Sequence, residues 1–382
     1  MKENKKLRLG YTTGTCAAAA AKGAALVLFG LRKAETFTVR LTTPKGIVLD
    51  LEPEQIRCGA GWASCGIRKD AGDDPDVTDG ILVFARVECR AEAGILIDGG
   101  EGVGRVTKKG LEQPPGSAAI NRIPREMIAE EVKEVCQAAG YEGGILVTIS
   151  VPGGRELAQK TFNPRLGIVG GISILGTSGI VEPMSEKALI KTIETEMRQQ
   201  IANGRKYLLV TLGNYGNAYL QGLDALPLKE SIRCSNYIGE TIDMAVELEA
   251  KGILFIAHIG KFIKVAGGLM NTHSRNGDCR SEIMAACGMR AGISYEGALH
   301  ILEAPTADQA IEIIDAEGLR EKVMEEITNR IHFYLKKRAY DALQVEAMIF
   351  SNTYGYLGET KGCRQLIRFL AESIERTEEK DI

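Results

Sequence analysis

The sequence has few histidines and no closely spaced cysteines, and both shortages exclude common kinds of metal site. Only four histidines occur among 382 residues, without an H-E-x-x-H pattern or a close histidine pair. The nine cysteines are scattered, and none forms a C-x-x-C pair. Scattered cysteines in odd number are typical of a reducing compartment, so we expect a cytoplasmic protein with buried, unreactive thiols and no protein-bound metal.

Long apolar runs and an excess of one charge are also missing. The 47 Lys and Arg residues nearly balance the 50 Asp and Glu residues, giving a net charge of −3, which argues against a dedicated nucleic-acid-binding protein. No run reaches the roughly 18 apolar residues of a membrane span. Lys22 interrupts the alanine-rich stretch after the basic N-terminus, which disfavours a signal peptide. We therefore expect neither nucleic acid nor a membrane as partner.

Glycine, in contrast, is abundant. It occupies 44 of 382 positions, or about 11.5%, against roughly 7% in average proteins. The excess has two explanations: ordinary turns, or a ligand site lined by backbone that only glycine allows to come close. The glycine patterns of a serine hydrolase elbow and of a P-loop are both absent, which disfavours these two enzyme classes.

The first part of the chain predicts a mixed α+β domain over residues 1–163. Threonines precede an alanine-rich stretch, which predicts a capped helix near 15–30. Alternating apolar residues on both sides of a Pro-Lys-Gly turn predict a β-hairpin over 37–51. The further elements expected here are strands at 81–88, 94–98 and 145–151 and a helix at 124–140.

The second part predicts a Rossmann-like α/β domain over residues 164–382, with a mostly parallel sheet. Short apolar runs alternate with helical patterns, which is typical of strands joined by crossover helices. Each run leads into a polar, glycine-containing loop, and in a parallel sheet these loops meet at the carboxyl edge, where ligands bind. The four runs are 172–179, 208–216, 253–261 and 347–355, and helices are expected at 279–290, 306–316 and 318–338.

Two glycine-containing motifs in the first domain are candidate ligand sites. Thr12, Thr13, Gly14 and Thr15 precede a helix, and such a start can bind a phosphate or carboxylate, or simply cap the helix. Gly100, Gly102 and Gly104 follow a strand, but the next residues read as extended chain, which disfavours a dinucleotide fold. Two explanations of this second motif stay open: a tight hairpin, or a close approach of the backbone to a ligand.

The third candidate is the carboxyl edge of the second domain. His258 ends an apolar strand, and in isolation such a histidine is more often a satisfied core residue than a catalyst. Basic and polar residues follow it within one region, namely Lys261, Lys264, His273, Arg275 and Arg280. The alternative to a ligand site is that these residues form a solvated, charged loop. The residues alone indicate an α/β enzyme that binds an anionic small molecule.

Several long segments resemble the CbiD family, which methylates C-1 of cobalt-precorrin-5B to give cobalt-precorrin-6A in anaerobic cobalamin biosynthesis. The matching segments are GYTTGTCAAAAAKGAA, DGGEGVGRVT, VTLGNYGNAY, CSNYIGETID and HIGKFIKVAGGLMNTHSR. The resemblance implies S-adenosylmethionine as methyl donor. It also implies a cobalt-containing tetrapyrrole as acceptor, with hand-over from the hydrolase that opens the lactone of cobalt-precorrin-5A.

This resemblance leads to a hypothesis for each site. A ring carbon of the acceptor attacks the methyl group, so the protein mainly positions two ligands, and His258 is an optional catalytic base. The donor is expected at Ser178, Gly213, Asn214 and Tyr215. The acceptor carboxylates are expected at Lys261, Lys264, His273, Arg275 and Arg280, facing Thr12–Thr15 and Gly100–Gly104. Two alternatives are a phosphate- or nucleotide-handling transferase using the GYTTGT helix start and a non-catalytic tetrapyrrole-binding escort.

Overall fold

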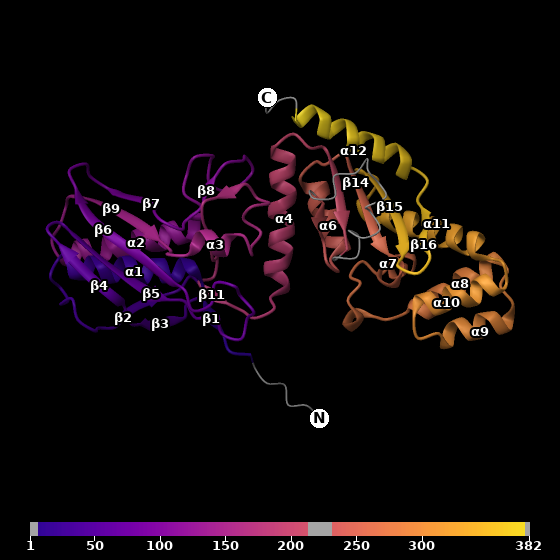
Figure 1. The fold of residues 1–382 in the computed structure, drawn as a ribbon, viewed down its shortest axis with the longest axis horizontal. Helices are drawn as coiled ribbons and strands as arrows, with labels where there is room; N and C mark the ends of the chain where they lie inside the picture. The colour runs from indigo at the N-terminus through magenta and orange to yellow at the C-terminus, as the bar shows by residue number, and fades with distance from the viewer. Residues whose placement is uncertain (1–6, 213–230, 379–382) are drawn as a thin grey trace. The chain divides into compact units, whose positions relative to one another are not determined.

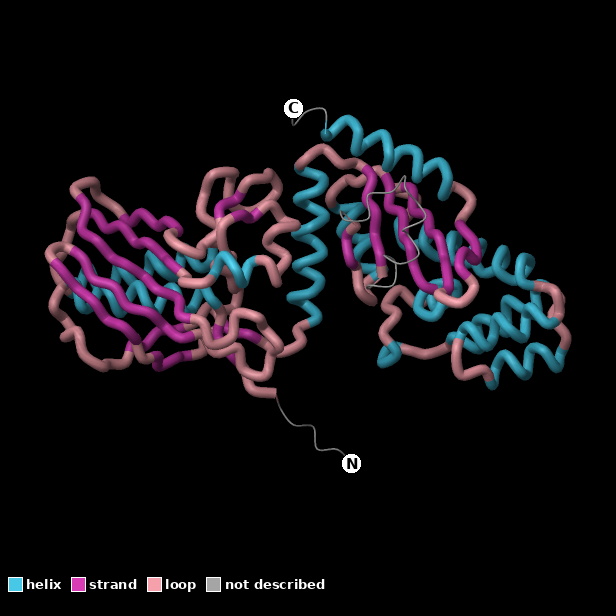
Figure 2. The backbone as a smooth tube through the Cα atoms, viewed as in Figure 1, coloured by secondary structure: helices cyan, strands magenta, loops and turns pink. Residues whose placement is uncertain are grey.

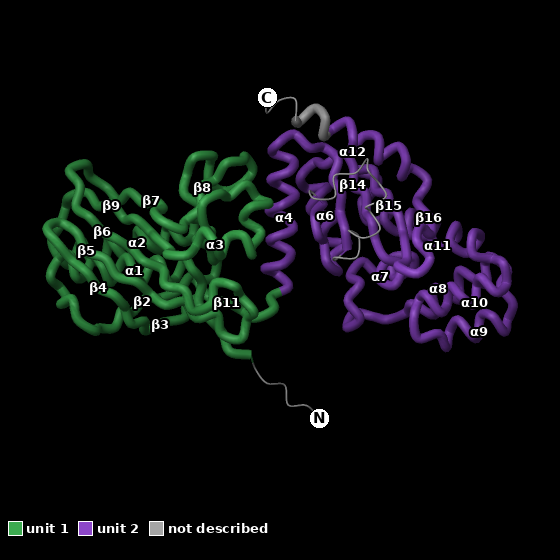
Figure 3. The backbone as a smooth tube through the Cα atoms, viewed as in Figure 1, with its two compact units in different colours: residues 1–185 green, residues 186–382 purple. Residues whose placement is uncertain are grey.

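The computed structural model describes residues 7–212 and 231–378 (Figure 1). Helices and strands occur together along the chain, in sheets of mixed orientation, so the protein is a mixed α/β structure (Figure 2). The chain forms two compact units, unit 1 over residues 1–185 and unit 2 over residues 186–382 (Figure 3). None of the helices formed by the described residues combines the length and hydrophobicity that crossing a bilayer requires.

The division between the units falls at 185/186, whereas the sequence suggests 163/164. The intervening residues pair with strands of unit 1. β10 (Ile168–Val169) is antiparallel to β8 (Arg105–Val106), and β11 (Ile180–Val181) is antiparallel to β1 (Gly10–Tyr11). Residues 164–185 therefore return to complete unit 1.

Unit 1 is built on a five-stranded sheet of order β4-β5-β6-β9-β7. Neighbouring strands are antiparallel except β7 and β9, which are parallel. Two helices lie behind this sheet in Figure 1 and share its hydrophobic core. These elements are β4 (Glu54–Gly59), β5 (Trp62–Arg68), β6 (Leu82–Arg90), β7 (Ile95–Gly99), β9 (Gly144–Ser150), α1 (Thr13–Leu28) and α2 (Arg122–Ala138).

Most local predictions for unit 1 are confirmed. The hairpin is formed by β2 (Val39–Thr42) and β3 (Val48–Leu51), and both predicted helices and the three predicted strands begin and end within a few residues of the expected bounds. A short helix, α3 (Gly154–Ala158), follows β9. Local signals are sufficient for these elements: α2, β6 and β9 have regularly spaced buried residues, and α1 has a threonine cap before its alanine run.

The alanine run of α1 has a structural cause. Ala17–Ala21 are all fully buried, at 0% exposure. Methyl side chains let the helix come close to the sheet, so that the Cys65 Sγ lies 3.2 Å from the Ala20 carbonyl oxygen. Larger residues would not fit this spacing because protein interiors are already packed densely. The run therefore serves helix-to-sheet packing.

Unit 2 contains a second five-stranded sheet, of order β13-β12-β14-β15-β16. The first four strands are parallel, and β16 is antiparallel to β15. The predicted strands at 208–216, 253–261 and 347–355 correspond to β12, β14 and β15. The strands are β12 (Tyr207–Thr211), β13 (Ile232–Arg233), β14 (Gly252–His258), β15 (Gln344–Ser351) and β16 (Gly355–Glu359).

Helices cover both faces of this sheet. One face packs against α4 (Glu186–Ala202), α6 (Ile238–Glu247), α7 (Ile259–Ala266) and α11 (Arg320–Ala339), and the other against α12 (Cys363–Glu378). Between β14 and β15 the chain also forms η2 (Ser274–Asn276), α8 (Arg280–Ala291), α9 (Tyr295–Glu303) and α10 (Ala307–Ala316). Helices α8, α9 and α10 pack together beside the sheet, and the predictions for α8, α10 and α11 are confirmed (Figure 1).

The prediction for 172–179 is wrong. This run is not a strand of the parallel sheet but part of unit 1, where Ile172 and Ile174 form isolated bridges to Val103 and Ile120. Both isoleucines are buried in the core of unit 1. An apolar run followed by glycine shows that a segment is buried, but it does not specify which sheet it joins.

Candidate functional site

The threonine-rich start of α1 is bonded to the rest of unit 1. Thr12 caps the helix by accepting a hydrogen bond from the Thr15 amide at 3.2 Å. The Thr15 hydroxyl donates to the Gly179 carbonyl at 2.7 Å, and the Thr13 hydroxyl accepts from the Leu175 amide at 3.0 Å. All three threonines are buried. Capping and internal bonding therefore account for this motif.

The backbone at Gly14 is engaged in the same way. Its amide donates to the Leu175 carbonyl at 3.0 Å. A Cβ atom at Gly14 would lie 2.7 Å from the side chain of Pro124, so glycine is needed for close packing. The helix start thus directs its polar groups at the chain itself.

The second glycine motif is a place where the chain crosses itself. Gly102 has a φ of +71°, and a Cβ atom there would lie 1.8 Å from the Val151 carbonyl oxygen. A Cβ atom at Gly104 would lie 2.3 Å from the Ile168 side chain, and the Gly100 amide donates to the Ile149 carbonyl at 2.7 Å. The close approach that glycine permits here is an approach to the protein's own backbone.

Of the four residues predicted to bind the donor, Ser178 does not lie at the carboxyl edge of the second domain, where the sequence interpretation expects it. It belongs to unit 1, where its hydroxyl donates to the Ile180 carbonyl at 3.0 Å, and not to a strand end of the parallel sheet. The reason is that 172–179 joins unit 1. Gly213, Asn214 and Tyr215 follow β12 and lie outside the described residues.

The carboxyl edge of the unit 2 sheet brings together the loops that follow β13, β14 and β15. The strands are parallel, so residues 234–237, 258–261 and 351–354 emerge on the same side. Helices α6 and α7 also begin at this edge, because α7 follows β14 directly and α6 follows β13 after residues 234–237. This edge is the candidate functional site.

His258 ends β14 and caps α7. Its Nδ1 accepts a hydrogen bond from the Gly260 amide at 3.1 Å, and its Nε2 lies 3.4 Å from the Asn352 amide nitrogen. Burial lowers the pKa of the imidazole, while the Asp308 carboxylate opposes that shift. The ring is therefore neutral near pH 7, and each nitrogen faces a backbone N–H group. This geometry is compatible with the core-histidine alternative.

Asp308, in the first turn of α10, fastens the loop after β15. Its carboxylate accepts hydrogen bonds from the Ser351 and Thr353 hydroxyls, both at 2.8 Å. The loop is thereby connected to the helices inserted between β14 and β15. Sequence reasoning missed Asp308 because it is 43 residues from Ser351 and stands in an ordinary acidic first turn.

Lys261, in the first turn of α7, lies at the same edge beside an uncharged partner. Its Nζ donates to the Asn236 Oδ1 at 3.2 Å. The same oxygen accepts a hydrogen bond from the Thr272 hydroxyl, also at 3.2 Å. Lys261 is half-buried and forms no ion pair with any residue that the structure describes. Asn236 was not predicted, because the two-residue strand before it has no recognisable pattern.

Lys264 differs from Lys261 although both are on α7. It is 3% exposed, and its Nζ donates to the carbonyls of Thr272 and Gly277 at 3.2 and 2.8 Å. The Asp278 carboxylate lies 3.5 Å away. Its prediction as a substrate-binding residue does not fit this burial, because the ammonium is already surrounded by oxygen atoms.

The other predicted basic residues also have partners within unit 2. Arg280 makes two hydrogen bonds to Asp278, at 2.6 and 2.9 Å, and this contact lowers the pKa of the carboxyl group. Arg275 forms an ion pair with Glu186. His273 accepts a hydrogen bond from the Arg275 amide through Nδ1 at 3.1 Å. The structure brings these residues into one region, where their charges are largely compensated.

A nucleophilic cysteine does not fit this edge. Cys234 follows β13 and is fully buried, and burial raises the pKa of its thiol to about 12. The thiolate is the reactive form, so this group is inert near neutral pH. Nor do three His, Cys, Asp or Glu side chains gather as a metal site anywhere in residues 7–212 and 231–378.

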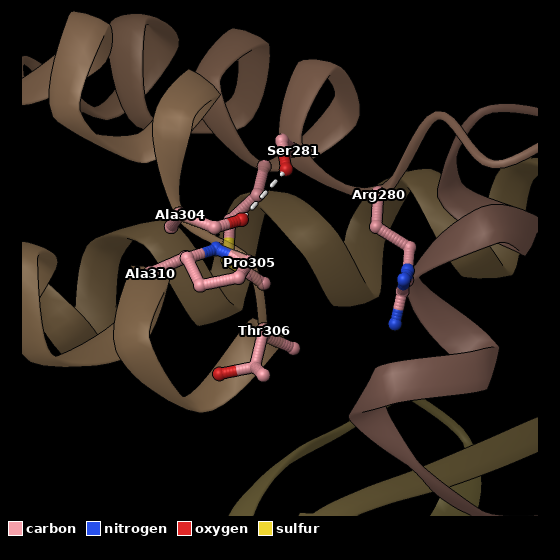
Figure 4. Close-up of a pocket in the computed structure, with 8 residues that line it drawn as sticks. Arg280, Ser281, Ala304, Pro305, Thr306 and Ala310 are labelled. Carbon is pink, nitrogen blue, oxygen red and sulfur yellow. Dashed lines mark hydrogen bonds between the residues drawn. The ribbon is translucent and has the colours of Figure 1, made fainter.

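A small hollow lies between the starts of α8 and α10 (Figure 4). Its enclosed volume is about 10 Å³, and Figure 4 shows residues that line it, among them Arg280 and Thr306. The Ser281 hydroxyl closes one end by donating to the Ala304 carbonyl at 3.2 Å. Sites for small molecules usually have roughly 300–1,000 Å³, so this hollow is too small for a macrocycle.

Comparison with known proteins points to one family. The family model described as CbiD matches residues 1–183, and that described as CbiD, C-terminal domain, matches residues 271–361. The chain is 48% identical to the cobalt-precorrin-5B C(1)-methyltransferase of Ruminiclostridium cellulolyticum, over 98% of each chain. It is 46% identical to the protein of that name from Thermoanaerobacter sp., over 94% of this chain and 97% of the other. A solved cobalamin biosynthesis protein (cbiD) from Archaeoglobus fulgidus is 30% identical, covering 68% of this chain and 80% of that one, with a TM-score of 0.37.

Proposed function

This chain belongs to the CbiD family, and we infer from that membership that it is a methyltransferase that methylates C-1 of cobalt-precorrin-5B in cobalamin biosynthesis. The observation that carries the inference is the 48% identity to a cobalt-precorrin-5B C(1)-methyltransferase over 98% of both chains. The two alternative functions have less support. A nucleotide-handling transferase would need a free helix start at α1, which is bonded internally, and the relatives are named as enzymes, not as carriers.

We propose S-adenosylmethionine as the methyl donor. It would supply a methyl group on a positively charged sulfur, which a carbon nucleophile can attack. The carboxyl edge of unit 2 suits a ligand with a carboxylate, because the ammonium of Lys261 is present there without an anionic partner among the described residues. The N-termini of α6 and α7 add a favourable field for negative charge.

We further propose that unit 2 is a Rossmann-like domain and that this domain holds the donor. Two features support the proposal: four adjacent parallel strands, and helices on both faces of the sheet. Ligands of such folds bind outside the carboxyl ends of the strands. Unit 1, with its mixed sheet and its internally bonded turns, would then serve mainly as a scaffold.

The proposed role of the protein is to position the two ligands. The attacking carbon belongs to the acceptor, so no enzyme nucleophile is required, in agreement with the raised pKa of Cys234. Correct orientation of two reactants can supply roughly 7–11 kcal/mol of the barrier. Lys261 binds a ligand carboxylate, which keeps one end of the ligand fixed.

His258 remains our candidate for a base. Burial keeps its imidazole neutral near pH 7, so it has a lone pair for a proton. A neutral imidazole has one lone pair, and Nδ1 uses it to accept the 3.1 Å hydrogen bond from the Gly260 amide, so Nε2 can accept a proton only after the ring changes tautomer and gives up that bond. The base role therefore depends on release of the cap that His258 makes on α7.

The acceptor is proposed to be a tetrapyrrole that arrives from the hydrolase acting on cobalt-precorrin-5A. In a coupled reaction that starts from cobalt-precorrin-5A, direct hand-over predicts that added hydrolase shortens the lag before methylation. In a reaction that starts from purified acceptor, added hydrolase should leave the rate of methylation unchanged. A stopped-flow comparison of the two conditions tests it, and an identical lag at all hydrolase concentrations would contradict direct transfer.

The experiment that tests the main proposal is an anaerobic incubation with cobalt-precorrin-5B and donor labelled with carbon-13 in the methyl group. The expected result is a product heavier by one methyl group in place of a hydrogen, with the label at C-1 by NMR. Acceptor binding without methylated product would favour the escort alternative. Thermal stabilisation by nucleotides, with no effect of the donor, would favour the transferase alternative.

A further inference from the structure

Asn236 occupies a central position at the carboxyl edge of unit 2. Its side-chain oxygen accepts two hydrogen bonds, from Lys261 Nζ and from the Thr272 hydroxyl, each at 3.2 Å. Its backbone carbonyl accepts a third, from the Thr272 amide at 3.0 Å. Asn236, in the loop after β13, thus connects the start of α7 to the loop that follows α7.

The backbone around Asn236 is held in place on both sides. Ser235 has a φ of +53°, a conformation that residues with a Cβ adopt only when the surroundings demand it. Tyr237 and Asn271 form an antiparallel bridge, and the Gly239 amide donates to the Met270 carbonyl at 3.0 Å. The backbone at Asn236 is therefore fixed, and the Thr272 hydroxyl holds the side-chain oxygen beside Lys261.

The chemical identity of this acceptor matters for the charge of Lys261. Arg275 and Arg280 are paired with carboxylates, which cancel most of their charge. An amide oxygen orients an ammonium group and leaves its positive charge uncompensated. The ammonium of Lys261 is thus half-buried and oriented, and with no carboxylate partner among the described residues it can attract an anion.

We propose that Asn236 is a positioning residue that holds the Lys261 ammonium ready to bind a ligand carboxylate at the carboxyl edge. The proposal deepens the function proposed above and rests on it, because both proposed ligands carry carboxylates. One source is the amino-acid end of the methyl donor, and the other is the set of acid side chains of the tetrapyrrole. The two sources share the same chemistry at Lys261.

The main test is the substitution Asn236→Asp. An aspartate keeps both hydrogen bonds and adds an ion pair to Lys261, so a purely structural role predicts unchanged ligand affinity. A positioning role predicts an unchanged or higher Tm together with a loss of about tenfold or more in affinity, because the carboxylate competes with the ligand for the ammonium. Asn276→Asp, which adds the same charge at the exposed end of η2, is the matched control.

A double-mutant cycle shows whether Asn236 acts through Lys261. Asn236→Ala should weaken binding in the wild-type background and change it less than about twofold in the Lys261→Met background. Equal effects in both backgrounds would mean that Asn236 supports the loop and not the ammonium, and the proposal would then be wrong.

Two probes distinguish the sources of the carboxylate. Calorimetry compares S-adenosylhomocysteine with 5′-methylthioadenosine, which lacks the amino-acid carboxylate. If the donor supplies the anion, Lys261→Met and Asn236→Asp weaken the first probe and leave the second unchanged. If the acceptor supplies the carboxylate, the two substitutions leave the affinity for both probes unchanged. The KM for cobalt-precorrin-5B then rises by about tenfold, with a smaller change in kcat.

The proposal is overturned if folded Asn236→Asp and Lys261→Met proteins match the wild type in S-adenosylhomocysteine affinity and in acceptor KM. This result differs from failure of the proposed function, in which the wild-type protein itself neither binds S-adenosylhomocysteine nor forms methylated product. Tm measurements on each variant separate loss of binding from loss of folding.

Discussion

The start of α1 in unit 1 and the carboxyl edge of unit 2 contain similar residues, but their polar groups are used differently. Both regions have glycine, threonine and other polar residues beside a helix N-terminus. In unit 1 the hydroxyls of Thr13 and Thr15 are bonded to residues 175–179. In unit 2 the ammonium of Lys261 is held by an uncharged amide and has no ion pair among the described residues.

The comparison shows that a polar motif near a helix start is informative about ligands only after its internal partners are known. Buried polar groups must be hydrogen-bonded, and the protein itself often provides the partner. The same distinction separates Lys261 from Lys264, which is enclosed by carbonyl oxygens one helical turn later. Four substitutions test this distinction, from the largest expected effect to the smallest.

Gly102→Ala should give the largest effect, a loss of about 2–5 kcal/mol in the free energy of unfolding. A left-handed residue with a Cβ costs roughly 1–2 kcal/mol, and overpacking adds about 1–3 kcal/mol. The clash arises because the new Cβ atom would lie 1.8 Å from the Val151 carbonyl oxygen. Gly116→Ala, with a φ of +90° and open space around it, is the control for conformation alone. Urea denaturation measures the free energy of unfolding of both variants. Equal losses in the two variants would contradict the packing explanation.

Lys264→Met should destabilise the protein by about 2–4 kcal/mol, because buried carbonyls and a carboxylate lose a charged donor. Lys261→Met, three residues earlier, should change the free energy of unfolding by less than about 0.5 kcal/mol while weakening ligand binding. Denaturant titration and calorimetry on the two proteins provide the comparison. If Lys264→Met also weakened binding at unchanged stability, the distinction between the two lysines would be lost.

Thr15→Val should cost about 1–2 kcal/mol and leave ligand affinity unchanged, because the lost hydroxyl serves the Gly179 carbonyl. Thr42→Val, at an exposed position of β2, should stay within about 0.5 kcal/mol. The measurements are thermal unfolding and donor titration. A selective loss of affinity in the Thr15 variant would restore the helix start as a ligand site.

His258→Asn should have the smallest effect on stability at pH 7, because asparagine is also a good helix cap. Burial lowers the pKa of His258 in the folded protein, so the unfolded chain binds the proton more readily. The contribution of His258 is therefore present above its ordinary pKa of about 6.5 and is lost as the pH falls below that value. The variant should lose less stability than the wild type between about pH 6.5 and 5.

The same variant tests the proposed base. If His258 accepts a proton during catalysis, His258→Asn should lower kcat at an unchanged Tm, since the cap is retained. An unchanged kcat would assign His258 to the core-histidine alternative. Initial rates at saturating donor and acceptor are the measurement.

The sequence was sufficient for elements whose pattern is local and complete. The hairpin β2–β3, the helices α1 and α2 and the long strands β12, β14 and β15 all have a clear period or a continuous apolar run. Residues 172–179 have the same kind of pattern but join unit 1, because an apolar run does not encode its partner. The short β13, with two residues, has too few positions for any period.

The candidate site was predictable in position and less so in detail. Parallel strands placed the polar loops at one edge, as expected from general topology. The sequence did not reveal that Lys264 is enclosed, or that Asn236 meets Lys261, because these contacts join positions separated by loops. The glycine excess predicted close approaches correctly, but at Gly102 and Gly104 the approaching group is the protein's own chain.

The contact between the start of α1 and residues 174–181 also affects how the chain folds during synthesis. Thr13 and Leu175 are 162 residues apart, so the first helix completes its hydrogen bonds only when nearly all of unit 1 has left the ribosome. Contacts between such distant positions slow folding. Alanine has the highest helix propensity, and the run in α1 presents little apolar surface, so the waiting segment can be helical without attracting other chains. A nascent chain that stopped at residue 163 would still lack the last segment that closes its first domain.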